Sequence, residues 1–331
     1  MSAIADRAFF DPAPAEPGTL VPAAVVVGIL IAGLLCLLSP SRKRREPDES
    51  PPNGAVSHAA VVKAAQRLNR ASGVLALSVM ADSGLEHWRG SFHNPIMYVP
   101  IVVSGVTIGV SLHGTADERP AAHAMRDGCY ALAAVTALIG GGFHVYNVTK
   151  RPGGLCWQNL FYGAPIGAPW ALLLAGVLGL YSERVREAAQ GEAPQVLSLP
   201  AGRTLAAIVA GGLAGTIGEV WLLHFRGAFH NPAMFLPVTA PPLAAVLLAN
   251  TAAGPKDRNR RFTRGWLRFT ALLGFAGVAF HSLGVQRNMG GWRNWSQNIL
   301  NGPPLPAPPS FTGLALAGLA ALGLMDDQPD A

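Results

Sequence analysis

A nine-residue motif rich in possible metal ligands and hydrogen-bonding groups occurs twice in this chain. Residues His87–Pro95 read HWRGSFHNP, and 137 positions later His224–Pro232 read HFRGAFHNP. A third histidine recurs at the same offset, as His144 and His281. Packing alone explains repeated apolar residues, but repeated His, Arg and Asn inside an apolar chain indicate a polar site that was duplicated with its scaffold.

Each copy of the motif offers ligand atoms for a cofactor. Neutral imidazole suits Cu, Zn, Fe or Ni, and a carboxylate can complete the coordination. Two matched acids precede the first histidine of each motif by five residues, so on a helix they point about 140° away from it and would have to meet a histidine of another helix or an arginine. The predicted metal ligands are His87, His93, His144, His224, His230, His281, Asp82 and Glu219, and the same six histidines with Arg89 and Arg226 are the predicted cofactor-binding residues.

The same residues also fit a haem, because two histidines from different helices can hold one between them. Gly140–Gly142 precede His144, Gly277–Ala279 precede His281, and small residues let a flat macrocycle approach a helix. The matched arginines would then pair with the propionates. The expected cofactor is therefore a transition metal (Cu, Zn or Fe) or haem b, and the sequence does not choose between them.

Two other interpretations fit the motif. The first is structural: a hydrogen-bonded network closes a turn between helices, in a non-catalytic scaffold or an anchor for an external partner. The second is transport between parallel repeats, although the repeated polar residues gather towards one face. The chain shows no Ser-His-Asp arrangement, phosphate-binding glycine loop or dinucleotide fingerprint, so the sequence leaves enzymatic activity undecided.

The composition is that of a membrane protein. Half of the residues are apolar and 13% are charged, against roughly a quarter charged in soluble domains, and the mean hydropathy is +0.31. The net charge of +6 does not indicate nucleic-acid binding, because basic residues collect in cytoplasmic loops of such proteins. The cysteines, Cys36, Cys129 and Cys156, are not matched between the copies and imply neither a disulfide framework nor a cysteine metal site.

The apolar runs predict an all-α fold: a polytopic transmembrane helical bundle of about nine spans. The first span, 19–39, is followed by the basic cluster RKRR and is expected to be an uncleaved N-terminal anchor helix. Two parallel four-helix repeats follow it. The further spans are 71–88, 95–113, 129–148 and 165–182, then 204–225, 232–252, 268–286 and 310–326, and the predicted domains are 1–70 (anchor and basic cytoplasmic linker), 71–190 and 204–326.

The charge distribution predicts the orientation. With the N-terminus outside and the C-terminus inside, the inside segments hold 18 of the 25 Lys and Arg residues, as the positive-inside rule requires. These segments are 40–70, 114–128, 183–203 and 253–268. An even number of spans in each repeat makes both repeats face the same way. The histidine motifs then lie at the extracytoplasmic face of the cytoplasmic (inner) membrane.

The elements that must position the histidines begin with Asn-Pro. Asn caps the free N–H groups of a helix start and Pro suits its first position, so Asn94 and Asn231 should each begin a span. Two external loops, Lys150–Pro165 and Arg287–Pro304, repeat a Gly-Gly, Trp and Gln-Asn pattern and would cover the site or dock a partner. The expected partners are the lipid bilayer, an extracytoplasmic protein and a quinone, with electron transfer inferred from the position of the site alone.

Overall fold

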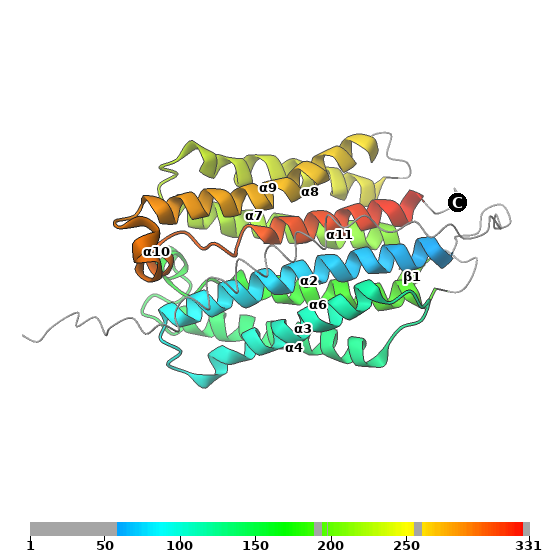
Figure 1. Ribbon diagram of the computed structural model, residues 1–331, viewed down its shortest axis with the longest axis horizontal. Coiled ribbons are helices and arrows are strands. Elements are labelled where there is room, and N and C mark those ends of the chain that lie inside the picture. Colours follow the sequence, from blue (N-terminus) through cyan, green and yellow to red (C-terminus); the bar gives the residue numbers. More distant parts are fainter. Residues whose placement is uncertain (1–57, 189–193, 197, 255–259, 327–331) are drawn as a thin grey trace, which may run out of the picture. The chain divides into compact units, whose positions relative to one another are not determined.

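The computed structural model describes residues 58–188, 194–196, 198–254 and 260–326 (Figure 1). The predicted anchor span 19–39 lies outside these residues. The long helices of the first half are α2 (His58–Arg89), α3 (Val99–Ala116), α4 (Ala124–Thr149) and α6 (Ala168–Arg186), and those of the second half are α7 (Ala201–Arg226), α8 (Leu236–Ala253), α9 (Arg260–Arg287) and α11 (Pro309–Asp326).

Short elements connect these helices. The 3-10 turns η2 (Pro95–Tyr98) and η3 (Pro232–Phe235) lead into α3 and α8. The other short elements are α5 (Trp157–Tyr162), η4 (Gly291–Asn294), α10 (Trp295–Asn301) and an antiparallel pair of strands, β1 (Gln195–Val196) and β2 (Leu199–Pro200).

The eight spans predicted for residues 71–326 each coincide with one long helix. The helices that start furthest ahead of their apolar runs are α2, at His58, and α9, at Arg260. The last part of the segment predicted as a cytoplasmic linker is therefore helical. The short helices α5 and α10 fall in the predicted external loops.

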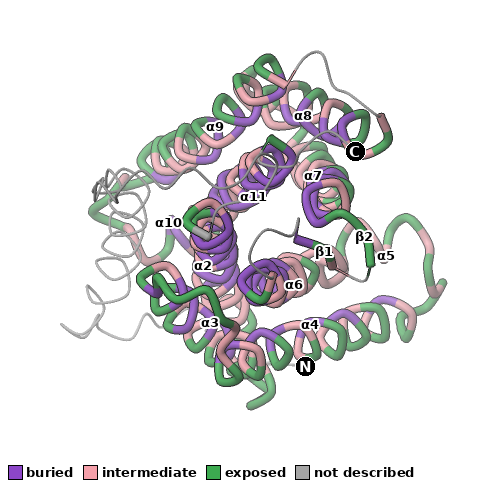
Figure 2. The backbone as a smooth tube through the Cα atoms, turned by 90° about the vertical axis from the view of Figure 1, so that its right-hand side faces the viewer, coloured by how far each residue is buried: buried purple, intermediate pink, exposed green. Residues whose placement is uncertain are grey.

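The core lies along four central helices, α2, α6, α7 and α11, while α3, α4, α8 and α9 flank them (Figure 2). Leu68, Leu178, Leu205 and Leu314 of the central helices are fully buried, together with many alanines. Small residues let helices approach closely, which is how helices associate in a bilayer. The central helices therefore pack against protein along most of their faces.

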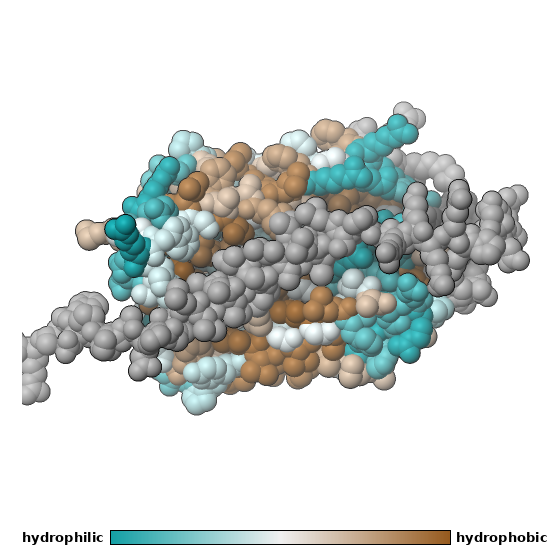
Figure 3. Space-filling view, in the orientation of Figure 1, coloured by the Kyte–Doolittle hydropathy of each residue, from teal (hydrophilic) through white to brown (hydrophobic). Residues whose placement is uncertain are grey.

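The flanking helices present apolar side chains outward. Val102 of α3 is 62% exposed and Leu272 of α9 is 66% exposed. Figure 3 shows a hydrophobic surface between two hydrophilic ends. An apolar surface of this extent is unfavourable in water but suits lipid, so the fold is that of an integral membrane helical protein in contact with the bilayer.

Within the described residues, six helical segments are long and apolar enough to cross a membrane. The predicted spans 71–88 and 165–182 fall on α2 and α6, which are not among the six. Both are central helices, and α2 packs against α3, α6 and α11, so its polar residues Asn69, Ser72 and Ser78 are buried against protein. The six segments are Pro95–Ala116, Ala124–Thr149, Ala201–Arg226, Pro232–Ala253, Arg260–Arg287 and Pro309–Asp326.

The turn between α2 and α3 is built by the residues of the motif. Ser91 and Phe92 have positive φ values of 57° and 44°, which reverse the chain. Asn94 Oδ1 then accepts a hydrogen bond from the N–H of Ile96 at 3.1 Å, as predicted for a helix cap. The ring of Phe92 stacks on Tyr98 at 4.3 Å between centroids. The turn between α7 and α8 has the same features at Ala228, Phe229, Asn231, Ala233 and Phe235.

Candidate functional site

Each of the six predicted histidines bonds a backbone carbonyl through Nδ1. Because a carbonyl oxygen can only accept, Nδ1 carries the proton, and a neutral ring keeps the lone pair on Nε2. The bonds in the first half join His87 to Met97 O at 2.5 Å, His93 to Gly90 O at 3.0 Å and His144 to Pro165 O at 2.6 Å. Those in the second half join His224 to Met234 O at 2.8 Å, His230 to Gly227 O at 2.9 Å and His281 to Pro304 O at 2.6 Å.

Prolines explain why these carbonyls need a donor. In the 3-10 turn η2 the carbonyl of Met97 would be paired with the N–H of residue 100, but Pro100 has none. The carbonyl of Pro165, at the start of α6, would be paired with residue 169, which is also proline. Pro237 and Pro308 stand at the corresponding places of the second half. At these four positions the histidines therefore supply hydrogen bonds that the backbone cannot make, whereas Gly227 O, the partner of His230, also accepts from a backbone N–H.

The histidines of each half influence one another electrostatically. In the first half this links His144 to His87, and in the second half it links His224 to both His281 and His230. Among the described residues none of the six Nε2 atoms has a hydrogen-bond partner. None of them is completely buried either. In His87, His144, His224 and His281, which are all half-buried, Nε2 therefore has no protein partner among the described residues.

In the part of the chain that the structure describes, no group of three or more His, Cys, Asp or Glu side chains is arranged to hold a metal ion. The matched acids lie at the boundary between the halves. Asp82 of α2 interacts electrostatically with Glu219 of α7 and with Glu86 and Arg89. The carboxylate of Glu219 lies against Gly167 of the first half, where any side chain would collide with it.

The matched arginines reach across this boundary. Arg89 pairs with Glu86, and its Nη2 donates to the carbonyls of Ile299 and Gly302, both at 3.0 Å. Arg226 lies over the ring of Phe161 at 5.6 Å. Each arginine thus contacts the segment of α10 or α5 in the other half, and the guanidinium of Arg89 is already engaged by protein groups.

Two further sequence features have a structural explanation. Gly140 and Gly141 lie against Pro169 and Trp170 of α6, where a Cβ would make an ordinary van der Waals contact at 3.7 and 3.6 Å, so they belong to the packing of α4 on α6. Asn159 donates from Nδ2 to Pro152 O and Gly154 O at 3.0 and 2.8 Å, which closes its own loop. Asn298 closes the second loop in the same way, onto Met289 and Gly291. Cys129 and Cys156 are free.

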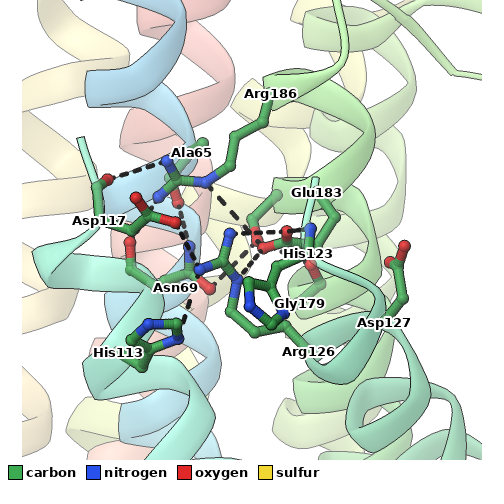
Figure 4. Close-up of polar contacts among 12 residues, drawn as sticks. Ala65, Asn69, His113, Asp117, His123, Arg126, Asp127, Gly179, Glu183 and Arg186 are labelled. Atoms are coloured by element: carbon green, nitrogen blue, oxygen red, sulfur yellow. Dashed lines mark hydrogen bonds and ion pairs between the residues drawn. The ribbon is translucent and has the colours of Figure 1, made fainter. Parts of the chain in front are cut away.

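A second polar cluster, which the sequence analysis did not identify, lies at the opposite end of the first half (Figure 4). It joins the start of α2, the end of α3, the start of α4 and the end of α6. We call it the buried charge network. Its fully buried members are Asn69, Arg126, Tyr130, Ser182, Glu183 and Arg186, and Asp117 is 9% exposed.

Arg126 is the centre of the buried charge network. It donates two hydrogen bonds to Glu183, from Nε at 2.8 Å and from Nη2 at 2.9 Å, and one to Asp117 Oδ2 at 2.7 Å. Arg186 donates to the carbonyls of Gly114, Asp117 and Arg119. The hydroxyls of Tyr130 and Ser182 both donate to Asn69 Oδ1, at 2.5 and 3.1 Å. The hydrogen bonds thus connect four helices.

The second half has no such network at the matched positions. The motif offset of 137 residues pairs Arg126 with Thr263. The loop Arg287–Pro304 is two residues longer than Lys150–Pro165, so the offset after it is 139 and pairs Glu183 with Leu322. Leu322 is buried among apolar side chains. A comparison of unmatched charges between the two copies could have found this cluster. The other positions opposite the network hold Ala206, Gly254, Leu267, Ala321 and Met325.

Asp117 lies in the loop between α3 and α4. Its carboxylate accepts hydrogen bonds from the N–H and guanidinium of Arg119 and from Arg126. These bonds, chiefly that from the Arg119 side chain, hold the pKa of Asp117 well below its usual value, although burial acts in the opposite direction. The carboxylate is therefore ionised wherever the fold is intact near neutral pH.

Comparison with protein-family models, curated proteins and solved structures gave no match for this chain.

Proposed function

We propose that this protein is a metal- or haem-binding membrane subunit with two equivalent sites, one at His87 and His144 and one at His224 and His281. One observation carries the proposal. In both halves a backbone carbonyl fixes the proton on Nδ1, while Nε2 of these rings has no protein partner among the described residues. A ring oriented by a carbonyl in this way is typical of metal-bound histidine.

The donor set fits an imidazole-binding metal centre. Two imidazoles would suffice to hold a haem iron, whereas a structural zinc ion takes four protein ligands. A single copper, zinc or iron ion would complete its shell with solvent or a substrate. When bound, the centre would supply electron transfer or Lewis acidity. Because Arg89 is engaged by Glu86 and two carbonyls, a haem in the first half would need other partners for its propionates.

The proposal includes the organisation of the chain. We infer two copies of one four-helix unit, facing the same way, behind an N-terminal anchor in the inner membrane. The matched histidine bonds, helix caps and loop closures of the two halves support the duplication. With the N-terminus outside, both sites face the extracytoplasmic side, where an external protein and a membrane quinone could exchange electrons through them.

Replacement of histidine by asparagine tests the sites. The amide nitrogen of Asn takes the place of Nδ1 and can still donate to Pro165 O or Pro304 O, but the Nε2 ligand is gone. The full chain is purified in detergent and its metal content and visible spectrum are measured. We expect His144→Asn and His281→Asn each to lose about half of the bound cofactor and the double variant to lose nearly all of it.

The matched control is His113→Asn, which changes an exposed histidine at the opposite end of the bundle and should leave the cofactor content unchanged. A Soret band identifies haem, and stoichiometric metal without this band identifies an ion site. A folded His144→Asn/His281→Asn variant that binds as much cofactor as the wild type would contradict the proposal. So would a folded wild-type protein, from cells supplied with metals and haem, that contains neither.

A purely structural function is the second candidate, because the Nδ1 bonds satisfy carbonyls whose usual donors are prolines. In this case the Asn variants keep the melting temperature of the wild type. His144→Ala and His281→Ala, which leave a carbonyl without a donor, lower stability by about 1–3 kcal/mol. A thermal unfolding series without any bound cofactor would establish this alternative.

A further inference from the structure

A cavity of about 450 Å³ opens at the end of the bundle away from the histidine pairs. It lies between the first turns of α2, the start of α9 and the last turns of α11. Its polar lining consists of Lys63 and Arg67 from α2, Arg264 from α9 and Asp326 from α11. None of these residues belongs to the histidine sites or to the buried charge network.

The charges of the described residues around this cavity do not balance. Asp326 is shared by two cations, since it pairs with Arg264 and, at 3.1 Å, with Arg260. Neither Lys63 nor Arg67 has a carboxylate partner among the described residues. The lining therefore carries an excess of positive charge, and a concave surface with low-dielectric walls concentrates the field of that charge on an anion.

The floor of the cavity is small and apolar. Gly323 lies under Arg67, so close that a Cβ at position 323 would be 3.1 Å from Nη1 of that arginine. Leu319 lines the same side. Both belong to α11, whose candidate span ends at Asp326, so the cavity lies at the level where lipid headgroups meet water. A lining that combines apolar residues such as Leu319 with basic side chains suits an anion that carries an apolar or glycerol part.

We propose that this cavity binds a phosphate-bearing anion, with its phosphate against Lys63, Arg67 and Arg264. Lys and Arg donate charge-assisted hydrogen bonds to phosphate oxygens, and basic pockets at the ends of transmembrane helices take anionic headgroups. The phosphate can belong to a lipid headgroup or to a free phosphate in the aqueous phase, and the test distinguishes these sources.

The test measures thermal unfolding of the full chain in neutral detergent during separate titrations with phosphatidylglycerol, phosphatidylcholine and inorganic phosphate. We expect phosphatidylglycerol to raise the melting temperature with saturation, and phosphatidylcholine to do so much less. A rise with inorganic phosphate as well would extend the site to free phosphate. The double variant Lys63→Gln/Arg67→Gln should weaken the apparent affinity by roughly fivefold for each basic side chain removed.

Two further variants complete the test. Arg261→Gln removes a charge from an exposed position beside Arg260, outside the cavity lining, and should bind as the wild type does. Gly323→Leu fills the cavity without changing its charge and should abolish saturable binding. The proposal is overturned if the double variant keeps wild-type affinity for every anion, if neither anion shifts the melting temperature, or if phosphatidylcholine acts as strongly as phosphatidylglycerol.

Discussion

Glu183 is the residue on which the buried charge network depends. Its carboxylate accepts two hydrogen bonds from Arg126 and one from the backbone N–H of His123, and Arg186 Nε lies 4.0 Å away. Removing one partner of a buried ion pair leaves an uncompensated charge, whereas replacing both partners by apolar residues is tolerated far better. At the position matched to Glu183, the second half has a leucine.

Replacement of Glu183 by leucine therefore tests the network. We expect Glu183→Leu to lower the free energy of unfolding by about 3–5 kcal/mol, because two buried guanidinium groups lose their shared carboxylate. The double variant Arg126→Met/Glu183→Leu should recover part of this loss. Denaturant unfolding in detergent measures both. Glu187→Gln, which breaks an exposed pair with Arg184, should cost less than about 1 kcal/mol, and an equal loss in this control would contradict the argument.

Asp117 makes the stability of this end depend on pH. Since the pKa of Asp117 is lowered on folding, its ionised form stabilises the folded state above the unfolded pKa of about 3.9, and this contribution disappears as the pH falls through the folded value. Asp117→Asn should unfold at a lower temperature than the wild type at pH 7, and the difference should narrow towards pH 3. A difference that is constant from pH 7 to pH 3 would show that the carboxylate charge has no such effect.

At the scale of elements, the apolar runs were sufficient to predict eight of the long helices. Their ends differed most at α2 and α9, because charged turns extend those helices beyond the apolar segment. The buried charge network could not be predicted in this way. Arg126 and Arg186 were counted as charges of cytoplasmic loops, since the sequence does not reveal that Glu183, far along the chain, reaches Arg126.

The histidine motif was predicted more completely than its acids. The Asn caps and the turn follow from local rules, and the structure confirms them. The partners of Asp82 and Glu219 depend on how the two halves pack, which no spacing within one copy specifies. The Nδ1 bonds also required the structure, because they join each histidine to a carbonyl across a turn.

The packing of α4 on α6 depends on glycine. A Cβ at Gly176 would lie 2.7 Å from the carbonyl oxygen of Tyr130 and 2.8 Å from the nitrogen of Ala134. Gly176→Ala should therefore force the helices apart and cost about 1–3 kcal/mol in unfolding free energy. Gly109→Ala in α3 is the control, since nothing lies within 4 Å of its Cβ. This control should be neutral or slightly stabilising, and similar losses in both variants would contradict the packing argument.

At the scale of the whole molecule, the two halves contact each other through segments that are matched in sequence but differ in chemistry. Ser78 of α2 donates to Pro306 O of the second half at 2.6 Å, and Arg89 donates to the end of α10. In the reciprocal contact Arg226 has a ring under its guanidinium, and Trp157 and Phe161 pack on Phe225. One boundary contact is therefore polar and the other aromatic.

This difference predicts unequal effects of matched substitutions. Arg89→Ala removes charge-assisted bonds to two carbonyls and should lower the free energy of unfolding by about 1.5–3 kcal/mol. Arg226→Ala removes an exposed cation–π contact and should cost about 0.5–1 kcal/mol. Thermal unfolding of both variants under the same conditions measures the ratio. Equal losses would show that the two boundary contacts are energetically equivalent.

The order of residues in the buried charge network bears on how the chain enters the membrane during synthesis. Arg126 leaves the ribosome well before Glu183, so α4 is made while its principal counter-ion is still to be translated. Asp117, however, precedes Arg126 by nine residues and bonds the same guanidinium. The hairpin of α3 and α4 can therefore enter the membrane with Arg126 already paired with Asp117. When α6 follows, Glu183 adds its two hydrogen bonds to Arg126 and links α6 to this hairpin.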